Sequence, residues 1–128
     1  MKAAIERTEI FPFATASSSG IPNVIPIRYL RVAGDDQIWI TDNYLLKTLA
    51  NLEENPLAAF YVWSQEPKLG FQVKGRIRIQ REGADYERMK ESVRRQKPDL
   101  PARALLVLQV SEVYQCLPGA DAGKRLLP

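Results

Sequence analysis

The polar side chains best suited to chemistry gather where a predicted strand passes into a predicted helix. They offer hydroxyls, a carboxylate, carboxamides and an ammonium, and they are Thr41, Asp42, Asn43, Lys47, Thr48 and Asn51. At about 100° per residue, Lys47 and Asn51 lie nearly in line on a helix and Thr48 flanks them, while the leucines point the opposite way. A helix start has unpaired backbone N–H groups and a positive dipole end. The spacing therefore predicts a site for a phosphate group.

These residues alone leave a second interpretation open. Thr41, Asp42 and Asn43 are all capable helix N-caps, and an isolated lysine on a helix surface is commonly just solvated. In that case the junction is only the start of a helix, and Lys47 is an ordinary surface residue.

The composition excludes several kinds of chemistry. The chain has no histidine, which rules out serine–histidine and cysteine–histidine hydrolysis. It also lacks the sulfur and imidazole ligands of a zinc site, so we expect no metal. Cys116 has no basic neighbour within three residues, and a single cysteine forms no internal disulfide. The net charge of +3 is compatible with an anionic ligand and is too small to demand nucleic acid.

Size and hydropathy predict one globular domain spanning residues 1–128. Hydrophobic residues make up 45% of the chain and charged residues 26%. No apolar run approaches the roughly 18 residues of a membrane-spanning helix. The first seven residues carry acid and base after a short apolar stretch, which does not make a signal peptide. With its lone cysteine, the chain is expected to be cytoplasmic.

The elements that must position the polar residues follow from hydrophobic periodicity. Alternation and apolar runs predict six strands at 11–18, 22–32, 37–41, 57–63, 69–80 and 104–113. Helical spacing predicts helices at 43–54 and 84–97, and the tail after Pro118 is expected to be a loop. Because most neighbouring strands are joined by short turns, this order favours a mainly β, antiparallel barrel.

Three of the predicted strands have a distinct character. Pro22 and Pro26 indicate an edge or a bulge, since proline cannot donate to the ladder. The nearly continuous apolar run 57–63 is typical of a buried central strand. The strand 69–80 alternates strongly, which places Lys74, Arg76 and Arg78 together on one face.

Several segments resemble the pyridoxamine 5′-phosphate oxidase-like, FMN-binding split-barrel family. TDNYLLK at 41–47, followed by a leucine-rich helix, Asn55-Pro56, an apolar strand and Trp63, resembles the family's phosphate-binding region. ATASSSGIPN at 14–23 resembles its first hairpin, and QVKG at 72–75 precedes a similar alternating strand, helix and final strand. The resemblance covers about residues 10 to 125 and is closest to the short members described as FMN-binding or flavin-nucleotide-binding proteins.

The resemblance implies a six-stranded antiparallel split barrel that binds FMN non-covalently. Lys47 would hold the FMN phosphate, helped by Thr48 and Asn51. The flavin and its ribityl chain would lie along Ile25, Pro26, Ile27, Arg28, Thr41 and Asp42. Family members are homodimers with flavin sites at the subunit interface, so Trp63 and Gln72 are candidates to approach the flavin from the partner chain.

The chain also departs from the pyridoxamine phosphate oxidases proper. They have an arginine just before the phosphate lysine, where this chain has Leu46, and C-terminal arginine and histidine for their substrate. The flavin site therefore carries over better than pyridoxamine 5′-phosphate oxidase activity does. We expect an FMN-dependent oxidoreductase or a flavin electron-transfer protein, with an unidentified electron donor or small-molecule substrate.

Two other functions stay open. A barrel with a basic strand face at Lys74, Arg76 and Arg78 could bind single-stranded nucleic acid, although a solvent-facing sheet side has the same pattern. A related split barrel could also carry a deazaflavin or heme in place of FMN. Heme would need a cysteine or tyrosine axial ligand, because no histidine exists.

Overall fold

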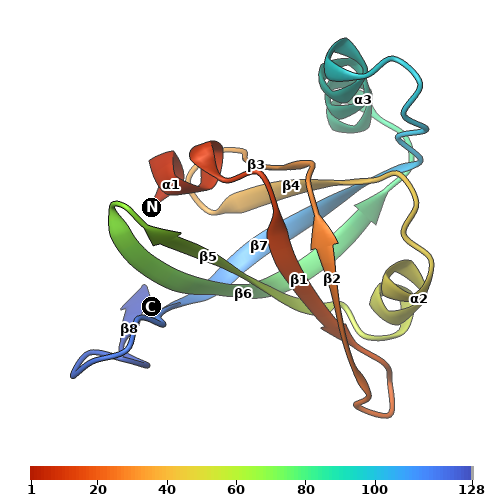
Figure 1. Cartoon of the computed structure of the whole chain (residues 1–128). Coiled ribbons are helices and arrows are strands. Elements are labelled where there is room, and N and C mark those ends of the chain that lie inside the picture. The colour runs from red at the N-terminus through yellow and green to blue at the C-terminus, as the bar shows by residue number, and fades with distance from the viewer. Residues whose placement is uncertain (128) are drawn as a thin grey trace.

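The computed structural model describes residues 1–127, which form one curled antiparallel sheet and three helices (Figure 1). The strands are β1 (Phe11–Ala16), β2 (Pro22–Ile27), β3 (Leu30–Val32), β4 (Gln37–Asp42), β5 (Leu57–Gln65), β6 (Lys68–Gln80), β7 (Ala104–Gln115) and β8 (Arg125–Leu127). The helices are α1 (Lys2–Arg7), α2 (Lys47–Glu54) and α3 (Ala84–Gln96). The prediction of a mainly β, antiparallel split-barrel fold is confirmed.

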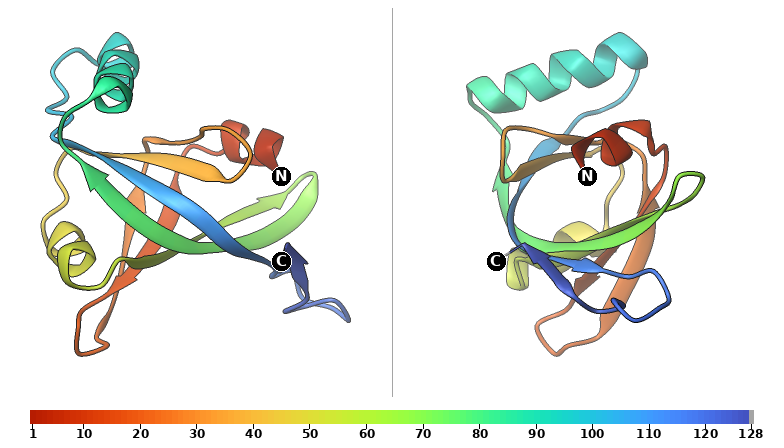
Figure 2. Two further views of the ribbon diagram at one scale, coloured as in Figure 1. Left: turned by 180° about the vertical axis from the view of Figure 1, so that it is seen from behind. Right: turned by 90° about the vertical axis from the view of Figure 1, so that its left-hand side faces the viewer.

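The strand order explains why the sheet curls into a barrel. It runs β2-β1-β5-β6-β7-β4-β3, with β8 added beside β7. β2 and β3 are consecutive in the chain and yet lie at opposite ends of this order, joined only by Arg28 and Tyr29. The Thr41 N–H also donates to the Tyr29 carbonyl at 3.0 Å. The two ends of the sheet are therefore held close together, and the curl is visible end-on in Figure 2.

One hydrophobic core fills the inside of the barrel. The inward residues of β6 are Phe71, Val73 and Ile77, and they meet aromatic and aliphatic side chains from the other strands. Phe11 and Phe60 are almost fully buried there and pack edge to face, with ring centroids 5.8 Å apart. The predicted alternation of β6 is thus confirmed, and its basic residues face outward.

A second core lies outside the sheet, beneath α3. Tyr86, Met89 and Val93 project from one face of α3 onto Trp39 of β4 and Val107 of β7. The helix packs at one end of the molecule, well separated from α2 (Figure 1). It covers the outer face of β4 and β7. The segment 97–103, which joins α3 to β7, therefore lies beside the end of β4, where the Arg103 N–H donates to the Asp42 carbonyl.

Gly75 sits where two strands approach too closely for a side chain. The register between β6 and β7 shifts between Lys74 and Gly75. A Cβ at position 75 would collide with the Gln109 carbonyl oxygen and lie 2.7 Å from Cδ2 of Leu108. Glycine is therefore required at this bulge by space rather than by backbone dihedrals.

Several predicted elements were wrong in extent. The range 22–32 is two strands, β2 and β3, because the chain leaves β1 and joins β4 between them. α2 begins at Lys47 and not at residue 43, α1 was not predicted, and the tail contains β8. The described residues consequently hold eight strands, where six were predicted. Pro22 and Pro26 indicated an edge or a bulge, and the structure shows the edge, since β2 ends the sheet.

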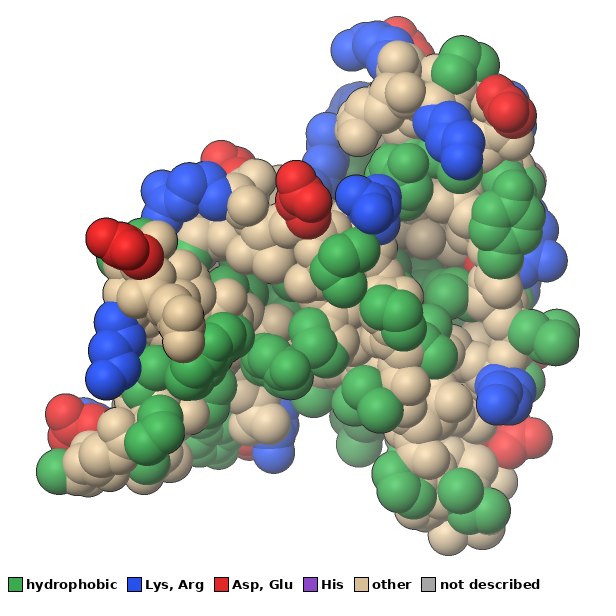
Figure 3. Space-filling view, viewed as in Figure 1, with side chains coloured by type: hydrophobic (Ala, Val, Ile, Leu, Met, Phe, Trp, Pro, Cys, Tyr) green, Lys and Arg blue, Asp and Glu red, His purple; other side chains and the backbone are tan. Residues whose placement is uncertain are grey.

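The prediction that 57–63 is buried on both faces is also wrong. β5 is central in the sheet, but Leu57, Tyr61 and Trp63 are 57%, 45% and 48% exposed on its outer side. Ala14 of β1 pairs with Ala59 of β5 and with Val24 of β2, so small and apolar residues continue across this outer face. Figure 3 shows hydrophobic side chains gathered over β1 and β2 as well. We call Val24, Ala14, Ala59, Leu57, Tyr61 and Trp63 the outer apolar strip.

Among residues 1–127, no helix is long and apolar enough to cross a membrane.

Candidate functional site

The start of α2 is built from a turn and not from a side-chain cap. The carboxylate of Asp42 accepts a hydrogen bond from the Leu45 N–H at 3.0 Å, which closes the turn before the helix. The N-cap is Leu46, and no side chain caps it. Thr41, Asp42 and Asn43, which are all capable N-caps by residue type, therefore do not cap this helix. The first turn of α2 is left with N–H groups that have no intrahelical acceptor.

Lys47 is the first helical residue and is exposed at this open helix end. Within residues 1–127 its ammonium takes part in no ion pair, although five other basic residues do. An unpaired ammonium beside unpaired N–H groups is an arrangement that attracts an anion. This end of α2 has the positive charge and the free donors that a phosphate site requires.

Thr48 and Asn51 serve to hold α2 against the β1–β2 hairpin. Thr48 is 2% exposed, and its hydroxyl accepts from the Asn23 side-chain amide at 3.0 Å. The Thr15 hydroxyl accepts from the amides of Asn51 at 3.1 Å and Asn23 at 3.3 Å. The expectation that Thr48 lies beside Lys47 on the open face of the helix is wrong, because the Thr48 side chain packs against the β1–β2 hairpin while Lys47 stays exposed.

Asp42 points into the protein and is 1% exposed. Its Oδ1 also accepts from Nη2 of Arg103 at 3.1 Å, and its Oδ2 is buried with no partner among the described residues. Next to it, the Asn43 side-chain oxygen accepts from the Ala102 N–H at 2.9 Å. Sequence reasoning missed Arg103, which lies 61 residues from Asp42 and carries no local signal.

A hollow of about 410 Å³ joins the end of β2 to the end of β4. The predicted site residues that line it are Ile25, Pro26, Ile27, Arg28 and Thr41. Tyr29, Asn43, Tyr44 and Leu45 complete the wall towards α2, and Lys97 and Leu100 close it from the α3 side. We call this hollow the β2–β4 pocket. Five residues predicted to contact one ligand are thus brought together.

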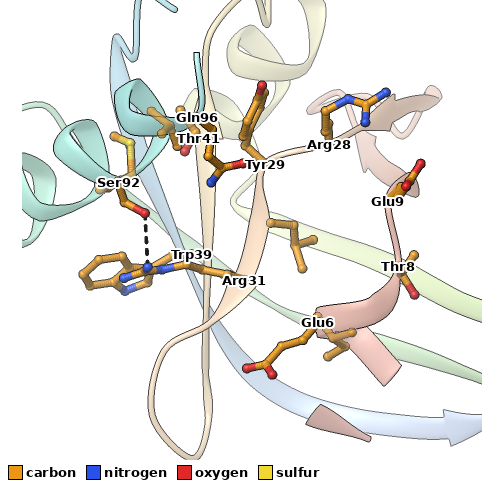
Figure 4. A pocket seen from close by; sticks show the side chains of 14 residues that line it. Glu6, Thr8, Glu9, Arg28, Tyr29, Arg31, Trp39, Thr41, Ser92 and Gln96 are labelled. Atoms are coloured by element: carbon orange, nitrogen blue, oxygen red, sulfur yellow. Dashed lines mark hydrogen bonds between the residues drawn. The ribbon is translucent and has the colours of Figure 1, made fainter. Parts of the chain in front are cut away.

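A second hollow, of about 330 Å³, shares Arg28, Tyr29 and Thr41 with the β2–β4 pocket (Figure 4). It lies between α1, β3 and α3. Arg31 stacks on Trp39, with its guanidinium carbon 5.1 Å from the ring centroid, and its Nη1 donates to Ser92 at 3.4 Å. The Trp39 Nε1 beneath it is buried without a partner among the described residues. We call this second hollow the α3 pocket.

Trp63 and Gln72 lie elsewhere on the subunit. With Tyr61 and Cys116 they line a separate outer hollow of about 420 Å³. Burial raises the pKa of the Cys116 thiol, so the thiol is less readily ionised than an ordinary cysteine. A single chain therefore separates the predicted residues: one group lines the β2–β4 pocket, a second lies on or just before α2, and Trp63 and Gln72 lie on the outer face of β5 and β6.

The basic residues of β6 are exposed, as the alternation predicted. Arg76 and Arg78 face solvent, and the Lys74 ammonium lies 5.5 Å from the ring centroid of Tyr114. The Tyr114 hydroxyl donates to Glu112 at 2.7 Å, and this hydrogen bond to a carboxylate raises the pKa of Tyr114.

Among residues 1–127, no cluster of acidic or sulfur side chains could hold a metal ion.

Comparison with known proteins gives a consistent family relationship. A family model described as "Pyridoxamine 5'-phosphate oxidase" matches residues 1–117. Uncharacterized protein MJ0282 of Methanocaldococcus jannaschii is 36% identical over 119 residues, which cover 91% of this chain and 78% of the relative. HupZ of Group A Streptococcus has the same fold, with a TM-score of 0.81, 28% identity and 96% of each chain covered.

More distant structures share the fold, and their names refer to different groups. An FMN-binding protein from Syntrophomonas wolfei is 21% identical, with a TM-score of 0.79 over 91% of this chain and 82% of that chain. An F420 reductase gives a TM-score of 0.67 at 20% identity, over 88% and 94% of the two chains. HutZ, the heme storage protein of Vibrio cholerae, gives 0.69 at 14% identity, over 89% and 90%.

Proposed function

Because this chain belongs to the pyridoxamine 5′-phosphate oxidase family, we propose that it binds FMN non-covalently and transfers electrons through it. The observation that carries the proposal is the position of the β2–β4 pocket beside the open end of α2. The pocket brings together Ile25, Pro26, Ile27, Arg28 and Thr41, and its wall runs through Asn43, Tyr44 and Leu45 towards Lys47.

The phosphate of FMN would lie at the start of α2. The Lys47 ammonium and the N–H groups of the first helical turn supply positive charge and donors there. Thr48 and Asn51 support this end indirectly, since their side chains fix α2 on Thr15 and Asn23. The donors present fit a dianionic phosphate.

The ring and ribityl chain would lie along β2 and the end of β4. Ile25, Pro26 and Ile27 offer an apolar wall, and the exposed Arg28 is suited to stabilise negative charge on the reduced ring. FMN itself supplies the redox chemistry when it is bound. The protein's task is to bind the phosphate, cover the ring and limit access of water.

We propose that the protein acts as a homodimer through the outer apolar strip. Leu57, Tyr61 and Trp63 are large, apolar and half exposed on one strand face, which is unusual for a surface that stays in water. Trp63 and Gln72 line a hollow on this face. Within one chain, Trp63 and Gln72 are separate from the proposed flavin site. In the proposed dimer, the partner subunit would bring its own copies of these two side chains towards the flavin.

The α3 pocket offers space for a substrate beside the ring. It adjoins the β2–β4 pocket through Arg28, Tyr29 and Thr41. An FMN-dependent oxidoreductase needs such a space, whereas an electron carrier needs only an exposed ring edge. This pocket favours the enzyme. Anaerobic reduction by NADH and NADPH tests the choice, and slow, unselective reduction by both would count against a nicotinamide-linked reductase.

A deazaflavin nucleotide is the second candidate, because its phosphate would use the same Lys47 and helix end. Heme fits less well, since the chain lacks histidine and a tyrosine such as Tyr29 or Tyr44 would have to act as axial ligand.

The exposed Lys74, Arg76 and Arg78 are the support for the alternative function, nucleic-acid binding. Absence of salt-dependent oligonucleotide binding at low salt would end that alternative.

Titration of cofactor-free protein with flavins tests the proposal. We expect one FMN per chain, and FMN should bind at least about tenfold more tightly than riboflavin, because riboflavin lacks the phosphate. Flavin fluorescence or isothermal calorimetry gives both affinities. Failure to bind FMN at all, or equal affinity for the two flavins, would refute the proposed site.

A further inference from the structure

Arg103 clamps the turn that precedes α2. It stands immediately before β7, and its Nη2 donates both to Oδ1 of Asp42 at 3.1 Å and to the Leu45 carbonyl at 2.9 Å. Its backbone N–H donates to the Asp42 carbonyl at 2.8 Å. A residue distant in sequence is thus fixed by three hydrogen bonds beside the turn from which α2 begins.

The guanidinium of Arg103 keeps unused donors in spite of this clamp. Arginine has five N–H donors, and the two described side-chain bonds both use Nη2. The groups at Nε and Nη1 find no acceptor among residues 1–127. The side chain is 50% exposed, whereas Asp42 is 1% exposed. The buried carboxylate therefore orients a guanidinium whose free donors remain accessible.

The backbone around Arg103 is held in a costly conformation. Ala102 has φ of 44°, the only non-glycine residue among 1–127 with a positive value. The neighbours lock it there, since the Tyr86 hydroxyl donates to the Ala102 carbonyl at 2.8 Å and the Ala102 N–H donates to Asn43. Strained residues that persist under such bracing are concentrated at functional sites.

We propose that Arg103 is a second phosphate-binding residue, acting with Lys47 on one ligand phosphate; this rests on the proposed binding of FMN. The guanidinium contacts the carbonyl of Leu45, two residues before Lys47. Consecutive Cα atoms are about 3.8 Å apart, so the Cα atoms of residues 45 and 47 lie within about 8 Å. Both cations can therefore reach one phosphate group at the start of α2. The planar fork of arginine suits phosphate oxygens better than a point charge does.

A purely structural role makes a different prediction. If Arg103 only braced the turn, its loss would displace the β2–β4 pocket as well, and FMN and riboflavin would both bind less tightly. If Arg103 contacts the phosphate, only the ligand with a phosphate loses affinity. The ratio of the two affinities therefore separates the roles.

The experiment compares Arg103→Gln with wild type and with Arg95→Gln, each titrated with FMN and with riboflavin. Glutamine can still donate to Asp42 or to Leu45, so the turn retains part of its clamp. Arg95 is a matched control because it is an exposed arginine on α3, paired with Glu91 and outside the site. Thermal unfolding of each variant shows that it is folded, and Arg103→Lys serves as the second variant if Arg103→Gln is not.

We expect Arg103→Gln to weaken FMN binding about tenfold, with riboflavin affinity changed less than about twofold and Arg95→Gln unchanged for both. Arg103→Lys should lose several-fold for FMN alone, because it keeps the charge and loses the fork. Equal losses for the two flavins, or none for FMN, would overturn the proposal. A wild-type protein that does not prefer FMN to riboflavin would instead refute the FMN site itself, before any variant is compared.

Discussion

The amide of Asn23 on β2 donates to the buried hydroxyl of Thr48 on α2, across 3.0 Å. This hydrogen bond fixes the start of α2 on the hairpin whose second strand lines the β2–β4 pocket. The proposed phosphate site at α2 and the proposed ring site along β2 are therefore held at a fixed distance from each other. The side chains that hold them are neutral and need not touch the ligand.

Replacing Thr48 by valine tests this connection. Valine keeps the shape of threonine and removes the acceptor, so Asn23 retains only its longer bond to Thr15. We expect the free energy of unfolding to fall by about 1 kcal/mol, measured by urea denaturation, and FMN affinity to fall slightly. Wild-type stability in Thr48→Val would show that the network does not hold α2 in place.

Replacing Lys47 by alanine tests the phosphate anchor. Loss of a charge-assisted contact costs about 1.5–3 kcal/mol, so FMN should bind at least about tenfold more weakly while riboflavin is hardly affected. Lys68→Ala is the control, because Lys68 is an exposed lysine at the start of β6. If Lys47→Ala binds FMN as tightly as wild type does, Lys47 is not the anchor.

Replacing Trp63 by aspartate tests the proposed dimer. Trp63 is 48% exposed on the outer apolar strip, so a charge there should leave the subunit folded and disrupt association. Sedimentation velocity should show a dimer for wild type and a monomer for Trp63→Asp. Gln65→Asp is the control on the same strand face, where a polar side chain already exists. Wild-type protein that sediments as a monomer would contradict the interface.

Replacing Gly75 by alanine tests the packing of β6 on β7. The added Cβ would meet the Gln109 carbonyl oxygen and a methyl group of Leu108, and backbone cannot move aside as a flexible side chain can. We expect a loss of about 1–3 kcal/mol in the free energy of unfolding. Arg76→Ala, at the exposed neighbouring position, should stay within about 0.5 kcal/mol of wild type. Equal stability of the two variants would contradict the predicted clash.

The sequence predicted best what depends on local periodicity. The alternation of β6 and the helix expected at 84–97 were predicted from residue order alone, and both are present. Together with the family resemblance they were enough to predict the split barrel. Of the residues expected along the flavin from the resemblance, Ile25, Pro26, Ile27, Arg28 and Thr41 line one pocket, whereas Asp42 does not.

Long-range contacts explain what the sequence did not predict. The first residues expected in α2 form a turn instead, since Asp42 bonds both Leu45 and the distant Arg103. Thr48 is buried because its acceptor oxygen meets Asn23 of another element. β8 forms because the C-terminal segment pairs with β7. A strand of three residues is too short to show a periodicity from which it could be predicted.

The most direct test of the account is the visible absorption spectrum of freshly purified protein, followed by mass determination of the chromophore released on denaturation. We predict a yellow protein with a two-band flavin spectrum that releases FMN at about one per chain, or a colourless protein that gains this spectrum when FMN is added. Release of a deazaflavin or heme, or a colourless protein that takes up no FMN, would contradict the central claim.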